Sequence, residues 1–360
     1  MASESPTATH TRLDGIQWGR ALAALLVVVC HAILHPLPEL SPFALYLGDV
    51  GVTIFFIISG FIMVTTTGRA QFDPWLFMRR RIIRIVPMYY LATLVVVFFT
   101  LFLPSLMKST QFDLQHVLLS LLFVPTYTPS TGALLPFFKL GWTLNFEMFF
   151  YLVFALLSFV GLRARMYAIL ALFGALAVLG LLFRFDNAIL AFYTRMDVLA
   201  FAAGVVLASV KDWRPWRVRR AVGAAGLAMG SAVIVGVYVI YGSIHASALA
   251  HLAVILAGTG LVAVFATHGQ GGENWAARSG VLLGDASYSL YLFHIFVVAA
   301  VWVGVGRIFG ALDLLPFVTV VVLASVASVL VCVVIHLVLE KPLTRVLNGY
   351  LGRRARPAAA

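Results

Sequence analysis

Charged residues are scarce in this chain of 360 residues. Only 11% of the residues are charged, whereas 62% are hydrophobic. A water-soluble domain usually carries about 25% charged residues, so this chain has too little polar surface to enclose a soluble globule of its size. The shortage of charge indicates that lipid surrounds much of the molecule.

Cysteines and recognition motifs are also few, which excludes several classes of protein. Cys30 and Cys332 both lie within hydrophobic runs, so they predict neither a disulfide framework nor a metal site. The net charge is +11, but no nucleic-acid recognition motif accompanies it, and we therefore expect no nucleic-acid partner. Ten-residue segments of alternating hydrophobic and polar residues are missing too, which argues against a membrane β-barrel.

Long hydrophobic runs are abundant, and they predict an all-α polytopic membrane bundle. Ten runs approach or exceed the roughly 20 residues that cross a bilayer as a helix. Residues 116–124 form a shorter run, which we expect to be re-entrant or to lie on the membrane surface. The ten predicted spans are 17–35, 48–66, 85–103, 141–159, 166–183, 188–210, 221–241, 248–267, 281–303 and 314–340.

Clusters of basic residues predict the orientation of the bundle. All four clusters fall on one side of the membrane if residues 116–124 do not cross it. Because positive loops are typically cytoplasmic, we predict two cytoplasmic termini and a location in a bacterial inner membrane. The predicted parts are a disordered cytoplasmic tail at 1–15, a transmembrane domain at 16–343 and a basic cytoplasmic tail at 344–360.

Charged side chains within the predicted spans are costly in lipid and mark either function or a buried pair. Arg20 and His31 lie eleven residues apart, which puts them on one helix face, about 16 Å apart along the axis. Counting residues from the outer surface puts Glu147 at the depth of His31, where a carboxylate could orient a general base. The alternatives are a snorkelling Arg20, a His31 bonded to a backbone carbonyl, and an ion pair between Glu147 and Arg195.

Two further sets of polar residues occupy predicted spans. Arg195 and Asp197 are two residues apart, so a continuous helix would direct them to different sides and different partners. Ser287, Tyr291 and His294 share one helix face at positions i, i+4 and i+7. Such a polar stripe either joins helices by hydrogen bonds or contacts substrate.

Six motifs follow one another in the order found in a known family. They are Arg20 with His31, FFIISGF at 55–61, Arg81 and Arg84 before Pro87, WTLNFEMFFY at 142–151, GDASYSLYLFH at 284–294, and Glu340-Lys341-Pro342. Together these motifs resemble those of the membrane-bound acyltransferases of the acyltransferase 3 type, over residues 13–342. One departure is Met148, where many members carry a second acidic residue.

The resemblance implies an O-acyltransferase that moves an acyl group, expected to be acetyl, from cytoplasmic acyl-CoA to a hydroxyl of a glycan or another cell-surface or secreted acceptor. The motif at 142–151 is most similar to the branch that acts on exopolysaccharides. His31 would be the general base or an acyl carrier, with Glu147 as its catalytic partner.

The resemblance also implies two sets of binding residues, and no metal. The phosphates of acyl-CoA would be bound by Arg20, Arg81 and Arg84. The acceptor would be bound by Ser287, Tyr291, His294, Trp142 and Asn145.

A proton-coupled transporter of a small molecule is the alternative function. Histidine, glutamate and arginine within a membrane also form proton relays. Transporters are often built from internal repeats with interrupted helices, and no such repeat is visible in this sequence. A sensor or scaffold would leave His31 and Glu147 unexplained.

Overall fold

The computed structural model describes residues 14–35, 42–67, 72–107, 110–209, 220–268, 275–309 and 314–354. These residues form helices and no β-strand, with one isolated bridge between Tyr127 and Leu134. The predicted all-α class is therefore confirmed. The α-helices are α1 (Asp14–Leu34), α2 (Pro42–Thr67), α3 (Pro74–Phe102), α4 (Leu114–Leu121), α5 (Trp142–Leu156), α6 (Leu162–Leu182), α7 (Ala188–Tyr193), α8 (Val198–Ser209), α9 (Arg220–Tyr241), α10 (Ala248–His268), α11 (Trp275–Phe309), α12 (Leu314–Ile335) and α13 (Lys341–Arg354).

Nine helical segments within the described ranges are long and hydrophobic enough to cross a membrane. The predicted polytopic bundle is confirmed, but the span predicted at 188–210 is not one helix, because α7 and α8 flank a break at residues 194–197. A break of this kind is tolerated in a membrane protein where neighbouring helices bury it. Helix α4 has eight residues, about 12 Å of length, and is too short to span, as expected.

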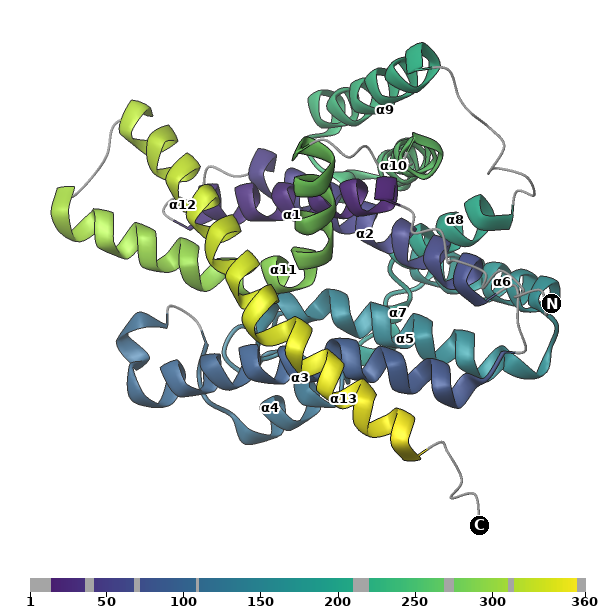
Figure 1. The fold of residues 1–360 in the computed structure, drawn as a ribbon, viewed down its shortest axis with the longest axis horizontal. Helices are drawn as coiled ribbons and strands as arrows, with labels where there is room; N and C mark the ends of the chain where they lie inside the picture. Colours follow the sequence, from purple (N-terminus) through teal and green to yellow (C-terminus); the bar gives the residue numbers. More distant parts are fainter. Residues whose placement is uncertain are drawn as a thin grey trace, which may run out of the picture.

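The predicted tails fall only partly within the described residues. Residues 1–13 and 355–360 lie outside them, while Asp14 begins α1. Residues 344–354 belong to α13, which follows α12 through a π-helical turn, η6 (His336–Glu340). Figure 1 shows α12 and α13 along one diagonal across the face of the molecule.

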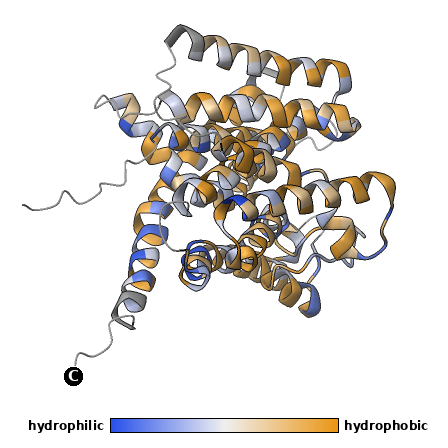
Figure 2. Ribbon diagram, turned by 90° about the vertical axis from the view of Figure 1, so that its right-hand side faces the viewer, coloured by the Kyte–Doolittle hydropathy of each residue, from blue (hydrophilic) through white to orange (hydrophobic). Residues whose placement is uncertain are grey.

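Most helices of the bundle consist largely of hydrophobic residues, as Figure 2 shows, and many of these side chains are exposed. Phe98 of α3, Leu181 of α6 and Val239 of α9 expose 52%, 57% and 75% of their surface. Such side chains are compatible with lipid and would be unfavourable in contiguous patches facing water. Helix α13 is more polar than the helices around it (Figure 2).

Small residues and stacked aromatic rings determine how the helices pack. A Cβ atom on Gly60 of α2 would collide with the carbonyl of Phe201, and one on Gly204 of α8 would collide with the carbonyl of Ile57. These two glycines therefore allow α2 and α8 to cross at close range. Beside the crossing, Phe201 stacks on Phe56, with ring centroids 4.4 Å apart.

Helix α11 connects two parts of the bundle. It packs against α1 on one side and α3 on another, while α1 contacts α2 and α3 contacts α5. The same relations are visible in Figure 1. The polar stripe of α11 thus lies between the helices that carry the other predicted site residues.

Candidate active site

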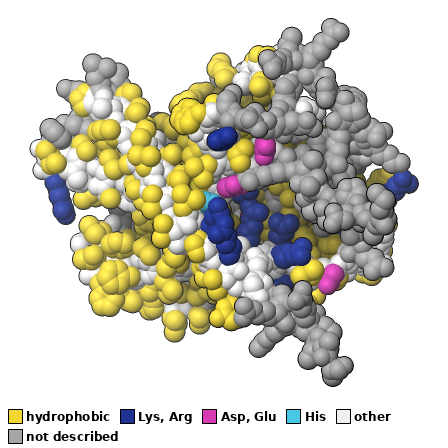
Figure 3. All heavy atoms as spheres, in the orientation of Figure 1, with side chains coloured by type: hydrophobic (Ala, Val, Ile, Leu, Met, Phe, Trp, Pro, Cys, Tyr) yellow, Lys and Arg dark blue, Asp and Glu magenta, His cyan; other side chains and the backbone are white. Residues whose placement is uncertain are grey.

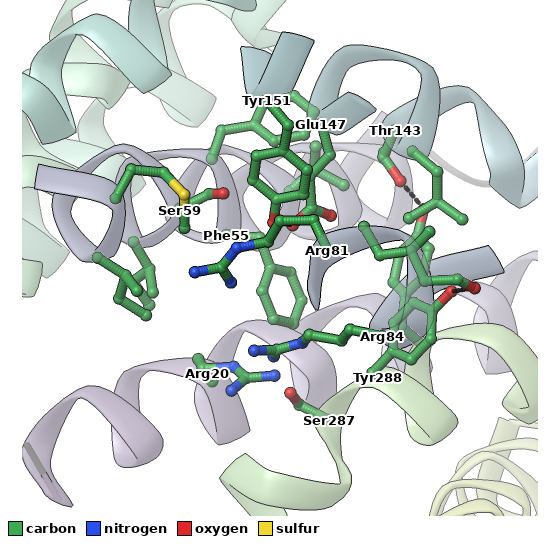
Figure 4. A pocket seen from close by; sticks show the side chains of 18 residues that line it. Arg20, Phe55, Ser59, Arg81, Arg84, Thr143, Glu147, Tyr151, Ser287 and Tyr288 are labelled. Atoms are coloured by element: carbon green, nitrogen blue, oxygen red, sulfur yellow. Dashed lines mark hydrogen bonds between the residues drawn. The ribbon is translucent and has the colours of Figure 1, made fainter. Parts of the chain in front are cut away.

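A pocket that is partly open to the outside lies among α1, α2, α3, α5 and α11. Figure 4 shows side chains from these helices pointing into one space. Its polar lining combines three guanidinium groups, one carboxylate and several hydroxyl groups. These residues are Arg20, Ser59, Arg81, Arg84, Thr143, Glu147, Tyr151, Ser287, Tyr288 and Tyr291.

The three arginines predicted to bind one ligand are brought together here. Helix α3 begins at Pro74, because the Asp73 side chain caps its first turn through hydrogen bonds of 2.9 and 3.0 Å. The helix therefore starts earlier than the predicted span, and Arg81 and Arg84 project from one of its faces instead of a loop. Arg20 reaches the same pocket from α1 (Figure 4).

The positive charge of the pocket is only weakly balanced. No ion pair joins Arg20, Arg81 or Arg84 to a carboxylate within the described ranges. Arg20 donates a hydrogen bond of 3.3 Å to Gln17, and the guanidinium of Arg81 lies 5.4 Å from the centroid of the Tyr151 ring. Figure 3 shows Lys and Arg side chains gathered near the centre of one face. An anionic group is the ligand best suited to this pocket.

Three buried polar atoms of the pocket have no hydrogen-bond partner. They are the Ser59 and Ser287 hydroxyl oxygens and Nε of Arg81. An unsatisfied buried polar group costs about 1–3 kcal/mol, and the side chain of Ser287 is fully buried. A polar ligand in the pocket would supply the missing partners.

Glu147 lies in this pocket and not beside His31. The Tyr151 hydroxyl donates a hydrogen bond to Glu147 Oε1 one turn away on α5, and no hydrogen bond joins Glu147 to His31, two residues that the structure describes. The predicted contact between Glu147 and His31 is therefore not formed, and the carboxylate lies with the arginines of the pocket. The alternative pair of Glu147 with Arg195 is not formed either.

His31 instead meets a histidine from the polar stripe. Its Nδ1 lies 3.2 Å from Nε2 of His294 and 2.9 Å from the carbonyl oxygen of Val27. Nδ1 of His294 lies 2.8 Å from the carbonyl oxygen of Leu290. The two rings meet edge to face at 61°, with centroids 5.0 Å apart. The sequence-based alternative of a carbonyl-bonded His31 therefore holds, but it describes only part of the contact.

The polar stripe of α11 faces both the pocket and the neighbouring helices. Ser287 lines the pocket, whereas Tyr291 donates its hydroxyl to the carbonyl of Leu140 at 2.9 Å and lies 2.7 Å from the Thr143 hydroxyl. Tyr291 also borders the pocket, and its ring centroid is 6.5 Å from that of His294. Tyr291 therefore lies between the pocket and the histidine pair.

Trp142 and Asn145 do not line the pocket. The centroid of the Trp142 ring lies 6.4 Å from that of Phe56. The guanidinium of Arg195 lies over the Trp142 ring, 5.0 Å from its centroid. Asn145 Oδ1 is buried without a hydrogen-bond partner, and the carbonyl of Asn145 accepts a hydrogen bond from Tyr193. Their predicted role in acceptor binding remains a prediction.

The expectation that Arg195 and Asp197 face different partners was wrong. Arg195 Nε donates to Asp197 Oδ2 at 3.0 Å. The helical periodicity behind the expectation does not apply, because the chain leaves α7 after Tyr193 and resumes a helix only at Val198.

Sequence reasoning did not nominate Ser59 and Tyr151. Ser59 is a polar residue inside a predicted span and within the FFIISGF motif, and this polarity alone could have identified it as a site residue. Tyr151 follows Glu147 at i+4 on α5, and helical spacing alone would have predicted their contact.

Comparisons with known proteins identify the family of this chain. The chain matches the family described as "Acyltransferase domain" (acyltransferase 3 type) over residues 13–337. It is 37% identical to "Exopolysaccharide production protein ExoZ" of Rhizobium meliloti (strain 1021) over 319 residues, which cover 86% of this chain and 95% of that protein. It is 30% identical to "Acyltransferase MdmB" of Streptomyces mycarofaciens over 152 residues, which cover 40% of this chain and 38% of that protein.

No solved structure matches the chain significantly. The family match nevertheless covers all of the pocket, both histidines and every helix from α1 to α12. A multi-pass membrane bundle that carries these motifs in this arrangement belongs to the acyltransferase 3 family, and this chain is a membrane-bound acyltransferase.

Proposed function

We propose that this protein transfers an acetyl group from cytoplasmic acetyl-CoA to a hydroxyl group of an exopolysaccharide or its lipid-linked precursor, in a bacterial inner membrane. The observation that carries the proposal is the cluster of three guanidinium groups without an ion pair among the described residues. The name of the relative with 37% identity supports an exopolysaccharide as the acceptor.

The donor fits the pocket by charge and by hydrogen-bonding capacity. Acyl-CoA is anionic through its phosphate groups, and arginine binds phosphate oxygens in a bidentate manner. Arg20, Arg81 and Arg84 would hold the phosphates, and the free hydroxyl groups of Ser59 and Ser287 would complete the contacts. Positive loops are typically cytoplasmic, the compartment in which acyl-CoA is made.

The transfer itself is assigned to His31. Arg20 and His31 lie on one face of α1, about 16 Å apart along the helix axis, and the long pantetheine arm of CoA would bridge this separation past Tyr291. His31 would take the proton of the acceptor hydroxyl while its oxygen attacks the thioester carbonyl, and CoA would leave as thiolate. A transient acyl group on His31 is the second possible route.

Glu147 would contribute through charge. Its carboxylate lies in the pocket with the arginines and fixes the Tyr151 ring against the guanidinium of Arg81. It would limit the repulsion among the three guanidinium groups before the donor binds. A direct catalytic part for Glu147 remains a prediction.

The test uses the purified protein in lipid nanodiscs with acetyl-CoA and de-O-acylated exopolysaccharide from the producing strain. We expect release of the CoA thiol that depends on the polysaccharide, together with new acetyl signals in its proton NMR spectrum. Polysaccharide whose hydroxyl groups have been fully acetylated in advance is the matched control and should give no release. Thiol release that is independent of the acceptor, or no release at all, would refute the proposal.

A further inference from the structure

The hydrogen bonds of the two histidines determine where their protons lie. A carbonyl oxygen can only accept a hydrogen bond. Nδ1 of His294, 2.8 Å from the carbonyl of Leu290, must therefore carry a hydrogen, and so must Nδ1 of His31, 2.9 Å from the carbonyl of Val27. In the neutral rings, both lone pairs are then on the Nε2 atoms.

This assignment gives the 3.2 Å contact a direction. Nε2 of His294 holds a lone pair and faces Nδ1–H of His31, so His294 accepts and His31 donates. His31 shares its hydrogen between Val27 and His294, and its own Nε2 has no hydrogen-bond partner among the described residues. The unused Nε2 of His31 is the nitrogen that can take a proton.

The surroundings of His294 leave its ring no nitrogen for a substrate. Its side chain is fully buried, and both of its ring nitrogens are engaged. The ring does not line the pocket, although Ser287 and Tyr291 of the same stripe do.

We propose that His294 is the positioning residue of the catalytic base, and not a substrate contact. It holds the ring of His31 so that Nε2 remains free, and it accepts the Nδ1–H bond that strengthens when His31 becomes positively charged. The carboxylate of a Ser-His-Asp triad stabilises its imidazolium in the same way. Here the acceptor is a neutral imidazole, buried at the contact between α1 and α11.

The proton balance of the step is complete. The proton of the acceptor hydroxyl moves to Nε2 of His31, the hydroxyl oxygen forms the new ester bond, and the carbon–sulfur bond of the thioester breaks. The thiolate of CoA then takes this proton from Nε2 and leaves as the thiol. His294 keeps the hydrogen on its Nδ1, which it donates to the carbonyl of Leu290, throughout.

This inference rests on the proposed role of His31, and two substitutions of His294 test it. His294→Leu removes the acceptor, whereas His294→Gln puts an amide oxygen close to the position of Nε2. We expect His294→Leu to lower kcat about ten- to a hundredfold, the loss typical of one hydrogen bond to a charged group, with an unchanged KM for acetyl-CoA. His294→Gln should recover part of that loss.

Trp302→Phe is the matched control for packing between the same two helices. Trp302 of α11 donates a hydrogen bond of 2.9 Å to the carbonyl of Ala32, the residue after His31. Removing it disturbs the α1–α11 contact and leaves both imidazoles intact, so kcat should hold. If Trp302→Phe costs as much as His294→Leu, or if His294→Leu costs nothing, the inference is wrong.

A second measurement requires neither an acceptor nor turnover. Diethyl pyrocarbonate acylates the unprotonated nitrogen of an imidazole, and peptide mass spectrometry reports each histidine separately. In the wild-type protein His31 should react and His294 should be protected, and the midpoint pH for His31 should shift in His294→Leu and return partly in His294→Gln. Preferential labelling of His294, or an unmoved midpoint, would overturn the inference. If acetyl transfer fails but the midpoint shifts, the proposed function falls and the histidine contact stands.

Discussion

At the scale of single residues, the charged side chains that would bind the donor and the histidine that would act as base lie in different places. The arginines lie in the pocket, and the histidine pair lies beyond Tyr291. Substitutions in the two places should therefore change different kinetic constants. Loss of binding should appear in KM, and loss of proton transfer should appear in kcat.

Substituting Arg84 tests the pocket. We expect Arg84→Ala to raise the KM for acetyl-CoA roughly ten- to a hundredfold, because one charge-assisted hydrogen bond is worth about 1.5–3 kcal/mol. Arg84→Lys should restore only part of the affinity, since lysine cannot form a bidentate contact. Arg80→Ala is the control, because Arg80 belongs to the same basic cluster but is exposed and does not line the pocket. Equal KM values for all the variants would show that the donor binds elsewhere.

Substituting His31 tests the base. His31→Ala should lower turnover about 10²- to 10⁴-fold, the usual loss for a general base, and more if His31 carries the acyl group. Binding of acetyl-CoA, measured by calorimetry on the purified variant, should be retained because His31 does not line the pocket. Turnover near the wild-type rate would make His31 a structural residue.

At the scale of the elements, close crossings of helices determine whether the site can form. Gly60 and Gly204 let α2 and α8 approach each other, and α2 contributes Ser59 to the pocket. A side chain at either glycine would push the two helices apart, because each Cβ would meet backbone atoms that cannot rotate away.

Gly60→Val is the direct test of this crossing. We expect a fall in Tm of several degrees or failure to insert, with a cost of about 1–3 kcal/mol or more for overpacking. Gly174→Ala in α6 is the control, because no atom lies within 4 Å of its added Cβ, and replacing a helical glycine by alanine is neutral or stabilising by up to about 1 kcal/mol. Thermal unfolding in detergent distinguishes the two variants, and equal Tm values would contradict the crossing.

A second contact between elements should respond to pH. His245 of η5 (Ile244–Ala246) lies 3.5 Å from Asp49 of α2, and this hydrogen bond raises the pKa of His245 despite partial burial. Because the folded-state pKa is raised, the contact stabilises fully below the unfolded value of about 6.5 and is lost as the pH rises through the folded value. His245→Gln should therefore lower Tm slightly at about pH 5.5 and not at about pH 8.5. An equal effect at both pH values would show that the charge contributes nothing.

At the scale of the whole molecule, the orientation in the membrane remains the main prediction. An acyl-CoA site must open to the cytoplasm, and the basic clusters predict cytoplasmic termini. Reporter fusions after Pro129, in the exposed turn that follows α4, should report the outer side. Fusions at the carboxy terminus should report the cytoplasm. A cytoplasmic signal after Pro129 would mean that the basic clusters do not lie on one side.

The sequence by itself determined the membrane class, the all-α fold, the family and the three arginines of the pocket. These features depend on composition, on hydrophobic run length and on local spacing such as Arg81 and Arg84 at i, i+3, all of which are encoded along one segment. The short run at 116–124 was also correctly excluded as a span, because eight helical residues cannot reach across a bilayer.

Only the tertiary structure decided which residues meet. Counting residues along each span paired His31 with Glu147, but in the structure the carboxylate of Glu147 lies in the pocket with the arginines. The pair of His31 and His294 joins residues 263 positions apart, and no periodicity within one helix relates them. Contacts between helices depend on how the helices cross. The crossings depend on small residues and close backbone contacts, and the sequence pattern alone does not show which of its small residues lie at a crossing.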